Sequence, residues 1–380
     1  MIPDVVIVGA GVIGASCAWH MARAGLRVRV LDRAAAPGGG STARATGGFR
    51  AQYSTAINIR LSLLARERLR AFHDDTGVDP GFVAVGYLWL AGSAAELAAL
   101  REANALQVRE GLSDACLVTT GDIAQLNPHV ATADVLGGAW CPSDGVIRPL
   151  EILRGYLAAP GVELCCNEPV IAVEHSGDRV ACVITPHGAH AAGMFVNAAG
   201  PWAAAVGQLA GVDVPVVPLR RQVAVTEATA ALPATMPLTI WLGDGFHARV
   251  RGDRVLLLRP TAGDPDPWSD RVDPAWLDDI ATRAPLCLPA LAGVPLDRPA
   301  AWAGLYEMTP DHHALLGFAP GCPNLLLATG CSGHGVMHAP ALGLLAAELA
   351  TAGHTRTLDA HLLRPSRFAE GQPIRGSSLL

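Results

Sequence analysis

The chain has 380 residues, of which 51% are hydrophobic, and it contains 41 glycines and 28 prolines. This composition is typical of a globular protein of one large or two ordinary domains, and it excludes a disordered or collagen-like chain. The net charge is −6, no basic cluster stands out, and all 28 basic residues are arginine, so nucleic acid is a poor partner and lysine chemistry is excluded.

The N-terminal segment predicts a strand, a glycine-rich turn, a helix and a second strand. Val5–Val8 is a short β-branched run, Ala15–Ala24 has the pattern of a helix, and Val28–Leu31 is a second strand. The turn after the first strand carries the pattern G-x-G-x-x-G at Gly9, Gly11 and Gly14. In this context the pattern is typical of dinucleotide-binding proteins.

Each residue of this turn has a physical reason in such a site. Gly9 allows the tight turn, Gly11 lets the backbone approach a pyrophosphate, and Gly14 lets the helix pack closely on the strand. The N-terminus of the helix faces the phosphates. Asp32 ends the second strand, eighteen residues past Gly14, and can accept hydrogen bonds from ribose hydroxyls.

The middle of the chain alternates between predicted strands, helices and hairpins. A glycine-rich loop at 37–54 precedes an amphipathic helix whose apolar face carries Ile57, Leu61, Leu64 and Phe72. Further strands are predicted at 86–92 and 194–200, a helix at 94–107, and hairpins at 173–185 and 247–260.

A buried strand, a glycine turn and a helix recur at three places. These turns are Gly9–Gly14, Asn197–Gly200 and Gly330–Gly335. Because the carboxyl ends of parallel strands lie at one edge of a sheet, the three turns can line a single crevice. An elongated cofactor would use all three, with its phosphates at the first and its redox ring at the last. This arrangement favours FAD over NAD.

Five sequence blocks then resemble one family from end to end. They are "VVIVGAGVIGASCAWHMARAG", "GGSTARATGGFRAQY", "VNAAGPWA", "WAGLYEMTPDHHALLG" and "GCSGHGVMHAPALG". The chain resembles the FAD-dependent D-amino-acid oxidase (DAO) superfamily, in particular the branch of sarcosine oxidase or dehydrogenase, dimethylglycine dehydrogenase and the β-subunit of dye-linked L-proline dehydrogenase.

The resemblance implies an α/β fold of two domains. A Rossmann-like FAD-binding domain would be discontinuous, formed by residues 1–80, 146–213 and 314–365. A substrate-binding domain with a mixed or antiparallel sheet would be inserted into it as residues 81–145 and 214–313, and 366–380 would form a C-terminal tail.

The resemblance also implies which residues contact FAD. Gly40, Ser41 and Thr42 would lie along the pyrophosphate and ring, and Gly333–Gly335 would pass beneath the pyrimidine edge of the flavin, where a helix N-terminus favours negative charge on the reduced ring. The full set of predicted contacts, beyond the glycines of the first turn, is Val12, Ile13, Asp32, Arg33, Gly40, Ser41, Thr42, Arg44, Ala45, Thr46, Gly47, Val170, Ala199, Gly200, Trp202, Gly304, Ser332, Gly333, His334, Gly335, Val336 and Met337.

Three residues are implied at the reacting end of the site. Arg50 corresponds to the arginine that grips the substrate carboxylate in sarcosine oxidases, and a guanidinium suits a carboxylate bidentately. Tyr306 would either hydrogen-bond the substrate or pack against it, and His334 would either take part in the chemistry or serve as a loop residue. Asp311 is expected to order its turn.

The departures from the family pattern are equally specific. Positions at which relatives attach the flavin through cysteine or histidine are Gly304 and Arg44 here, so the FAD is predicted to be non-covalent. Met337 replaces a second carboxylate anchor, a lysine, of monomeric sarcosine oxidase, and the oxygen-activating lysine of those oxidases has no counterpart. This favours a dehydrogenase that passes electrons to another acceptor.

The predicted reaction is oxidation of the C–N bond of a small, secondary or N-methyl amino acid, with hydride transfer to flavin N5 and formation of an imine. Two alternatives stay open: an oxidase that releases hydrogen peroxide, and a flavin-carrying subunit of a larger complex. The predicted partners are the amino acid and an unidentified electron acceptor. Whether the protein forms a homo-oligomer or a hetero-oligomer stays open.

Other features of the sequence point to a cytoplasmic protein without a metal. The nine cysteines lack a C-x-x-C pair, which fits a reducing compartment. No apolar run reaches the roughly 18 residues that a membrane span requires. The pairs His312–His313 and His187–His190 have no third ligand at metal spacing.

Overall fold

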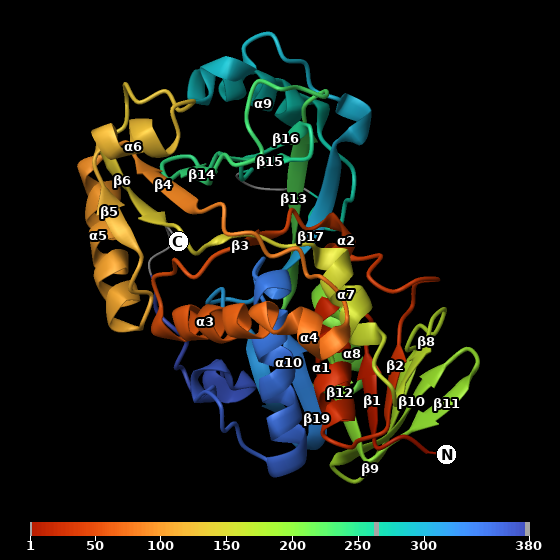
Figure 1. Cartoon of the computed structure of the whole chain (residues 1–380). Helices are drawn as coiled ribbons and strands as arrows, with labels where there is room; N and C mark the ends of the chain where they lie inside the picture. Colours follow the sequence, from red (N-terminus) through yellow and green to blue (C-terminus); the bar gives the residue numbers. More distant parts are fainter. Residues whose placement is uncertain (1, 262–265, 377–380) are drawn as a thin grey trace.

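The computed structural model describes residues 2–261 and 266–376. Two large sheets dominate it and lie one above the other in Figure 1. The lower, six-stranded sheet has the order β18 (Leu315–Ala319), β19 (Cys322–Thr329), β12 (Met194–Asn197), β1 (Val5–Val8), β2 (Val28–Leu31) and β8 (Val162–Cys165). Its strands run parallel, except that β18 pairs with β19 in the antiparallel sense at one edge.

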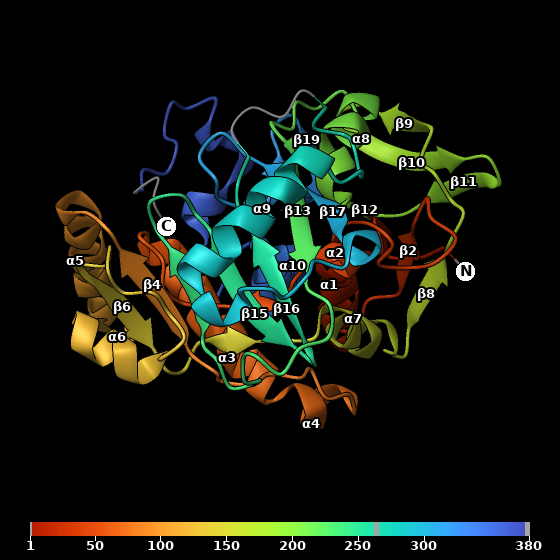
Figure 2. The same ribbon diagram turned by 90° about the horizontal axis from the view of Figure 1, so that it is seen from above.

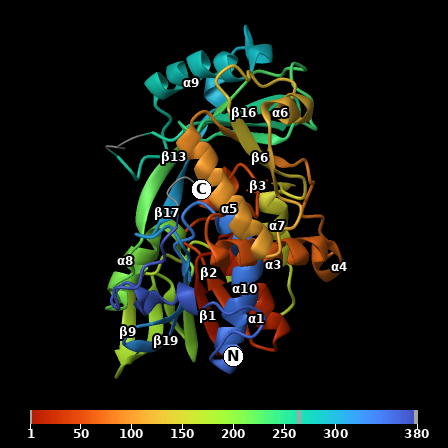
Figure 3. The same cartoon turned by 90° about the vertical axis from the view of Figure 1, so that its left-hand side faces the viewer.

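Both faces of this sheet are covered, because its strands are apolar at successive positions. Val5 and Ile7 belong to the core beneath the helices α1 (Val12–Arg23), α3 (Ala56–Arg70) and α10 (Gly335–Ala352). Val6 faces the opposite side, against α8 (Ala203–Leu209) and the small sheet of β9 (Ala172–Ser176), β10 (Arg179–Thr185) and β11 (Gly188–Ala191). Figures 1 and 3 show α10, in blue, beside α1 and α3. Alternating side chains thus build a core on each face.

The three predicted glycine turns follow three neighbouring strands. β1, β12 and β19 are contiguous in the sheet and parallel to one another. Their carboxyl ends therefore open at one edge, as the sequence predicted.

The upper, eight-stranded sheet is mixed. Its order is β17 (Trp302–Met308), β13 (Val217–Val225), β16 (Arg254–Leu258), β15 (His247–Arg251), β14 (Leu238–Trp241), β4 (Tyr87–Ala91), β6 (Gly137–Cys141) and β5 (Cys116–Val118). Only β14 and β4 pair in parallel among its described neighbours. All of these strands lie within the segments 81–145 and 214–313, and the domain boundaries themselves stay a prediction.

One face of the eight-stranded sheet is closed by helices. α9 (Pro274–Cys287) lies across β13, β15 and β16 in Figure 2, and Trp276 and Ile280 of this helix join Leu257 of β16 in one core. Further helices and strands are α2 (Ser41–Arg44), α4 (Phe72–Thr76), α5 (Ala94–Arg109), α6 (Thr120–Leu126), α7 (Pro149–Leu157), β3 (Gly48–Phe49) and β7 (Gly145–Val146). The other face of the sheet is turned toward the carboxyl edge of the six-stranded sheet.

Two predicted helices have different limits in the structure. α1 begins at Val12, directly after the turn, and not at Ala15, because the residues between them are already helical. The amphipathic helix predicted from Ile57 to Phe72 is divided at Ala71 into α3 and α4.

One described helix, α10, is long and apolar enough to cross a membrane by length and composition alone. However, 56% of this 18-residue helix is buried inside the protein, against α1 and α3. α10 therefore packs as a helix of the protein core.

Candidate functional site

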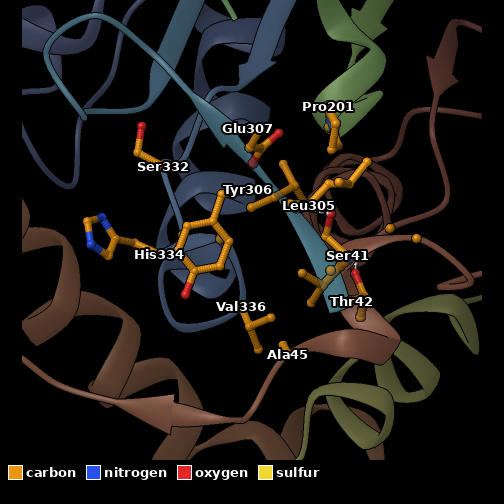
Figure 4. Close-up of a pocket in the computed structure, with 18 of the residues that line it drawn as sticks. Ser41, Thr42, Ala45, Pro201, Leu305, Tyr306, Glu307, Ser332, His334 and Val336 are labelled. Atoms are coloured by element: carbon orange, nitrogen blue, oxygen red, sulfur yellow. Dashed lines mark hydrogen bonds between the residues drawn. The ribbon is translucent and has the colours of Figure 1, made fainter. Parts of the chain in front are cut away.

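A cavity of about 1200 Å³ lies between the two sheets. Ligand pockets for one small molecule usually have about 300 to 1000 Å³, so this space suits a large cofactor together with a second molecule. The three glycine turns line one part of it, and the inner face of the eight-stranded sheet lines the other. Figure 4 shows its central part, where β17 passes between α2 and the turn before α10.

The first glycine turn is shaped by close backbone contacts. Gly9 has a φ of 107°, and a Cβ there would lie 2.4 Å from the carbonyl oxygen of Ala198. A Cβ on Gly14 would lie 1.9 Å from the carbonyl oxygen of Gly9. Gly14 does not line the cavity, in contrast to the other predicted contacts, so it serves helix packing and not direct contact with a cofactor. Gly11 does line the cavity, and its nearest neighbour is the Thr42 hydroxyl, 3.4 Å from a Cβ placed there.

The chemistry of this end suits a dinucleotide. Asp32 is held at the end of β2, where its two carboxylate oxygens accept from the N–H groups of Ala10 (2.7 Å) and Ala34 (2.8 Å). Thr42 accepts from the N–H of Val12 (3.1 Å) and so caps one donor of the first helical turn. The remaining N–H groups of that turn have no partner within the helix, which makes this helix end a site for an anion such as a diphosphate.

Planar side chains lie at the outer end of the same cavity. The guanidinium carbon of Arg33 is 4.0 Å from the ring centroid of Trp202, and both residues line the cavity. Val170, from the segment that follows β8, also lines the cavity. The arrangement offers a flat, apolar surface on which an aromatic ring can stack.

The two positions at which relatives attach their flavin lie in contact here. A Cβ on Gly304 would be 2.8 Å from the Cβ of Arg44, so the arginine stem occupies the space above the glycine. The Arg44 guanidinium donates to the carbonyl oxygens of Gly39 and Gly40, the latter at 3.2 Å. Neither position carries a nucleophile, and no cysteine occurs among the described residues that line the cavity.

The third glycine turn brings Tyr306 and His334 together (Figure 4). Gly333 has a φ of 90°, and a Cβ on it would lie 2.4 Å from Cε2 of Tyr306. Only glycine therefore allows the tyrosine ring to rest on this backbone. Burial, followed by the positive charge of Arg50, holds the pKa of His334 well below its usual value. The imidazole is therefore neutral at physiological pH.

Glu307, next to Tyr306 on β17, is a cavity residue that the sequence analysis did not single out. Its carboxylate accepts from the hydroxyl of Thr329 (3.0 Å) and from the N–H of Cys331 (3.1 Å). Burial raises the pKa of Glu307. Glu307 therefore connects β17 to the turn after β19. In the sequence, only its position in the block "GLYEMTPD" could have indicated that it lies at the site.

Arg50 lies at the inner end of the cavity between two aromatic rings. Its guanidinium carbon is 4.1 Å from the ring centroid of Tyr53 and 5.0 Å from that of Trp89. Nη1 donates to the carbonyl oxygen of Gln52 at 2.7 Å. No ion pair joins Arg50 to a carboxylate in residues 2–261 and 266–376. The remaining N–H donors can thus serve a ligand in the cavity.

A buried carboxylate holds the backbone beside Arg50. Asp144, between β6 and β7, accepts from the N–H groups of Ala51 (2.8 Å) and Gln52 (3.3 Å). Burial raises the pKa of Asp144 to about 7, against these hydrogen bonds and the nearby arginines, which lower it. Asp144 therefore connects the eight-stranded sheet to the segment that carries Arg50.

The roof of this end is a row of side chains from neighbouring strands. Trp89 pairs with Ile240, Ile240 with His247, and His247 with Leu258, and all four line the cavity. The Nδ1–H of His247 donates to the carbonyl oxygen of Gly245 (2.9 Å), because a carbonyl can only accept. This row was not predicted from the sequence, because hairpin patterns do not reveal which face of a strand is turned inward.

The C-terminal segment reaches the cavity through a buried ion pair. Arg367 is fully buried, and its Nε and Nη2 each lie 2.8 Å from a carboxylate oxygen of Asp311. Asp311 also accepts from the N–H of Ile374 at 3.0 Å, and Ile374 lines the cavity together with Gly376. Asp311 also accepts from the N–H of His313 at 3.2 Å, so it orders its own turn, as expected, and anchors the tail.

The side chains that could hold a metal do not gather into a site. In the described part of the chain, no three histidine, cysteine, aspartate or glutamate side chains form such a group. His313 is instead engaged with the hydroxyl of Thr55 at 2.8 Å.

A parallel sheet that ends in three glycine turns, covered by a second sheet across a long cavity, defines a dinucleotide-dependent enzyme with a shielded reaction site. The family comparison makes this specific. Residues 4–349 match the family described as FAD dependent oxidoreductase (DAO), and the chain belongs to that family.

Similarity to individual proteins covers nearly the whole chain. The chain is 30% identical to FAD-dependent oxidoreductase domain-containing protein 1 of Bos taurus, over 99% of this chain and 87% of that protein. The structure of L-proline dehydrogenase from P. horikoshii superimposes with a TM-score of 0.91 at 25% identity, covering 98% of this chain and 99% of that one. Glycine oxidase from Geobacillus kaustophilus gives a TM-score of 0.85 at 25% identity, covering 96% and 98%.

These findings confirm three predictions made from the sequence. The chain is an FAD-dependent oxidoreductase, its fold is the mixed α/β fold of that family, and its cofactor is FAD. The roles of individual residues stay predictions. Apart from Gly14, all residues predicted to contact FAD line the cavity, as do Arg50, Tyr306 and His334.

Proposed function

We propose that this protein is an FAD-dependent dehydrogenase that oxidises the C–N bond of a small amino acid with a secondary amine. The observation that carries the proposal is Arg50, a cation at the inner end of the cavity with donors free for a ligand carboxylate. The structural relatives are named for proline and glycine, which share a carboxylate next to an amine.

The residues proposed to hold FAD follow from the geometry of the cavity. The first turn of α1 would bind the diphosphate, Asp32 the ribose, and the wall of Arg33 and Trp202 the adenine. The backbone of the turn Ser332–Val336 would lie against the flavin. When bound, FAD accepts a hydride, and with it two electrons, from the carbon of the C–N bond.

The protein's own contribution is binding, orientation and exclusion of water. Arg50 would hold the carboxylate bidentately, with its position limited by Tyr53 and Trp89. The apolar roof residues Ile240 and Leu258 would remove water from the reacting carbon. Tyr306 is protonated, because burial raises the pKa of its hydroxyl, so this residue can donate to the substrate without adding negative charge.

The assignment as a dehydrogenase depends on the group at position 337. Met337 lines the cavity, and its sulfur accepts from the Tyr53 hydroxyl at 2.9 Å. A neutral thioether thus occupies this wall, and the chain has no lysine that could place an ammonium group near the flavin to assist reaction with oxygen. The similarity to glycine oxidase supports a second candidate, an oxidase that releases hydrogen peroxide.

An anaerobic screen tests the proposal. Purified protein containing FAD is mixed with sarcosine, L- and D-proline, hydroxyproline, glycine and dimethylglycine, and bleaching of the flavin absorbance is followed. We expect bleaching by at least one secondary amine and slow recovery of colour after air is admitted. Rapid recovery with formation of hydrogen peroxide would favour the oxidase. A protein that binds FAD but bleaches with no amino acid would contradict both.

A further inference from the structure

Arg249 is a buried cation to which the proposed function assigns no role. It lies on β15 two residues after His247, so both side chains leave the same face of the strand, whereas Ala248 faces the core beneath α9. Only 6% of Arg249 is exposed. In the part of the chain that the structure describes, no carboxylate acts on its charge, and its buried Nε has no hydrogen-bond partner. Burial lowers the pKa of Arg249 to about 10, so the guanidinium stays charged at physiological pH.

The guanidinium contacts the loop between α2 and β3. Its Nη1 donates to the carbonyl oxygen of Thr46. Gly47 has a φ of 74°, and a Cβ on it would lie 2.3 Å from the carbonyl oxygen of Ile147 and 3.3 Å from Nη1 of Arg249. No side chain therefore separates the guanidinium from the backbone of the loop. Thr46 and Gly47 line the cavity and Arg249 does not, so Arg249 reaches the cavity through this loop.

The peptide between Thr46 and Gly47 transmits the contact. This peptide is trans, and the C=O and N–H groups of a trans peptide point in opposite directions. Because the carbonyl of Thr46 points to Arg249, the N–H of Gly47 points away from it. This N–H has no acceptor among the described residues. A charged donor on a carbonyl polarises its peptide and strengthens the N–H as a donor.

The position of Arg249 is costly for the protein alone. A buried cation is stabilised by a carboxylate or by several acceptors, and Arg249 has a single carbonyl oxygen. An anion in the cavity would offset this cost. The flavin ring of FAD is uncharged when oxidised and takes up negative charge on reduction, so the compensation would come with reduction.

We propose that Arg249 is a positioning residue that raises the reduction potential of the bound FAD. It acts through the Thr46–Gly47 peptide, whose N–H would stabilise the negative charge that develops on the ring. The inference rests on FAD as the cofactor, which the family match shows, and not on the identity of the amino acid. A higher potential makes the cofactor a better acceptor for the two electrons of a C–N bond.

Four variants separate charge, hydrogen bonding and folding. R249M removes both the charge and the donor, R249Q keeps a neutral donor for the carbonyl of Thr46, and R249K keeps the charge as a compact ammonium group. R251M is the matched control. Arg251 follows two residues later on the same face of β15, is exposed, and lies over Trp302 with its guanidinium carbon 5.0 Å from the ring centroid.

The experiment measures the reduction potential of the bound FAD in the absence of any amino acid. Each protein loaded with FAD is titrated anaerobically with dithionite against a reference dye, and the dissociation constant of oxidised FAD is measured by fluorescence. The two values give the affinity for reduced FAD relative to oxidised FAD. We expect R249M to lower this ratio roughly tenfold, or about 30 mV for a two-electron couple. R249Q should lower it nearly as much and R249K less, and R251M should leave it unchanged.

A purely structural role would give a different result. If Arg249 only holds the loop, R249M will lower Tm or the affinity for oxidised FAD without changing the potential, and the proposal is overturned. The proposal is also overturned if R249Q has the wild-type potential, because the charge is then not needed. If R249M does not bind FAD, the comparison of R249K with R249Q decides: a higher potential in R249K supports the proposal, and equal potentials overturn it. Since no amino acid is added, the outcome is independent of the screen that tests the proposed function.

Discussion

Removal of the Arg50 side-chain charge is the most direct perturbation of the proposed site. In Arg50→Gln, the cavity loses the guanidinium between Tyr53 and Trp89, which lies 4.1 Å and 5.0 Å from their ring centroids. A hydrogen bond to a charged group contributes about 1.5 to 3 kcal/mol. Loss of the bidentate contact to a carboxylate should therefore cost about 3 kcal/mol, or roughly 100-fold or more in kcat/KM.

Arg50→Lys separates charge from geometry. A lysine keeps the positive charge but lacks the planar fork, and it stacks less well on the two rings. We expect kcat/KM to fall by about tenfold, which corresponds to roughly 1.4 kcal/mol. Both variants should bind FAD as the wild type does, because Arg50 lies at the end of the cavity away from the first glycine turn.

Stopped-flow reduction of the flavin under nitrogen gives the dissociation constant of the amino acid and the rate of reduction separately. The expected effect is mainly on the dissociation constant. Arg60→Gln is the matched control, since Arg60 is an exposed arginine of α3 that pairs with Glu110 at 2.5 Å. If Arg50→Gln retains the wild-type dissociation constant, Arg50 does not bind the carboxylate and the reasoning from its position is wrong.

Three further variants test the supporting structure. Gly333→Ala should lower Tm and FAD affinity, since the new Cβ would lie 2.4 Å from Tyr306 at a φ of 90°; the double variant with Tyr306→Ala should recover part of the loss, and no recovery would refute the clash. Asp311→Asn should reduce unfolding free energy by about 3 to 5 kcal/mol in urea titrations, because it leaves buried Arg367 without its carboxylate, and an unchanged midpoint would contradict this. For Asp144, the folded-state pKa is raised from 3.8 to about 7, so its contribution to stability is complete below the lower value and is lost as pH rises toward the higher one. Asp144→Asn should therefore flatten the decline of stability across this window, and an identical slope in both proteins would refute it.

The cofactor side of the cavity could be predicted from the sequence because its contacts are made by backbone. Where the main chain must approach a ligand or another strand, only glycine fits, as at Gly9 beside the carbonyl of Ala198. This requirement produces a characteristic spacing of glycines, which can be recognised in the sequence without a structure. The three turns were thus predicted, together with their position at one edge of a parallel sheet.

The substrate side could not be predicted in the same way, because its contacts are made by side chains. Trp89, His247 and Arg221 come from three strands of one sheet and meet only through its register. A hairpin pattern gives the strands but not which face is turned to the cavity. Arg50 was identified only because its sequence block resembles a known family. No sequence pattern indicated Asp144, because its role is to accept hydrogen bonds from two N–H groups of a segment distant in the sequence.

The charges around the cavity explain how a protein with a net charge of −6 can select anions. The carboxylates that line the cavity are already engaged by protein groups: Asp32 by two N–H groups, Glu307 by Thr329 and Cys331, Asp311 by Arg367, and Glu168 by His187. Among the described residues, the groups left to a ligand include the helix N-termini of α1 and α10 and the guanidinium of Arg50. A protein with a net negative charge thus has a locally positive cavity. This cavity suits the diphosphate of FAD at one end and a carboxylate substrate at the other.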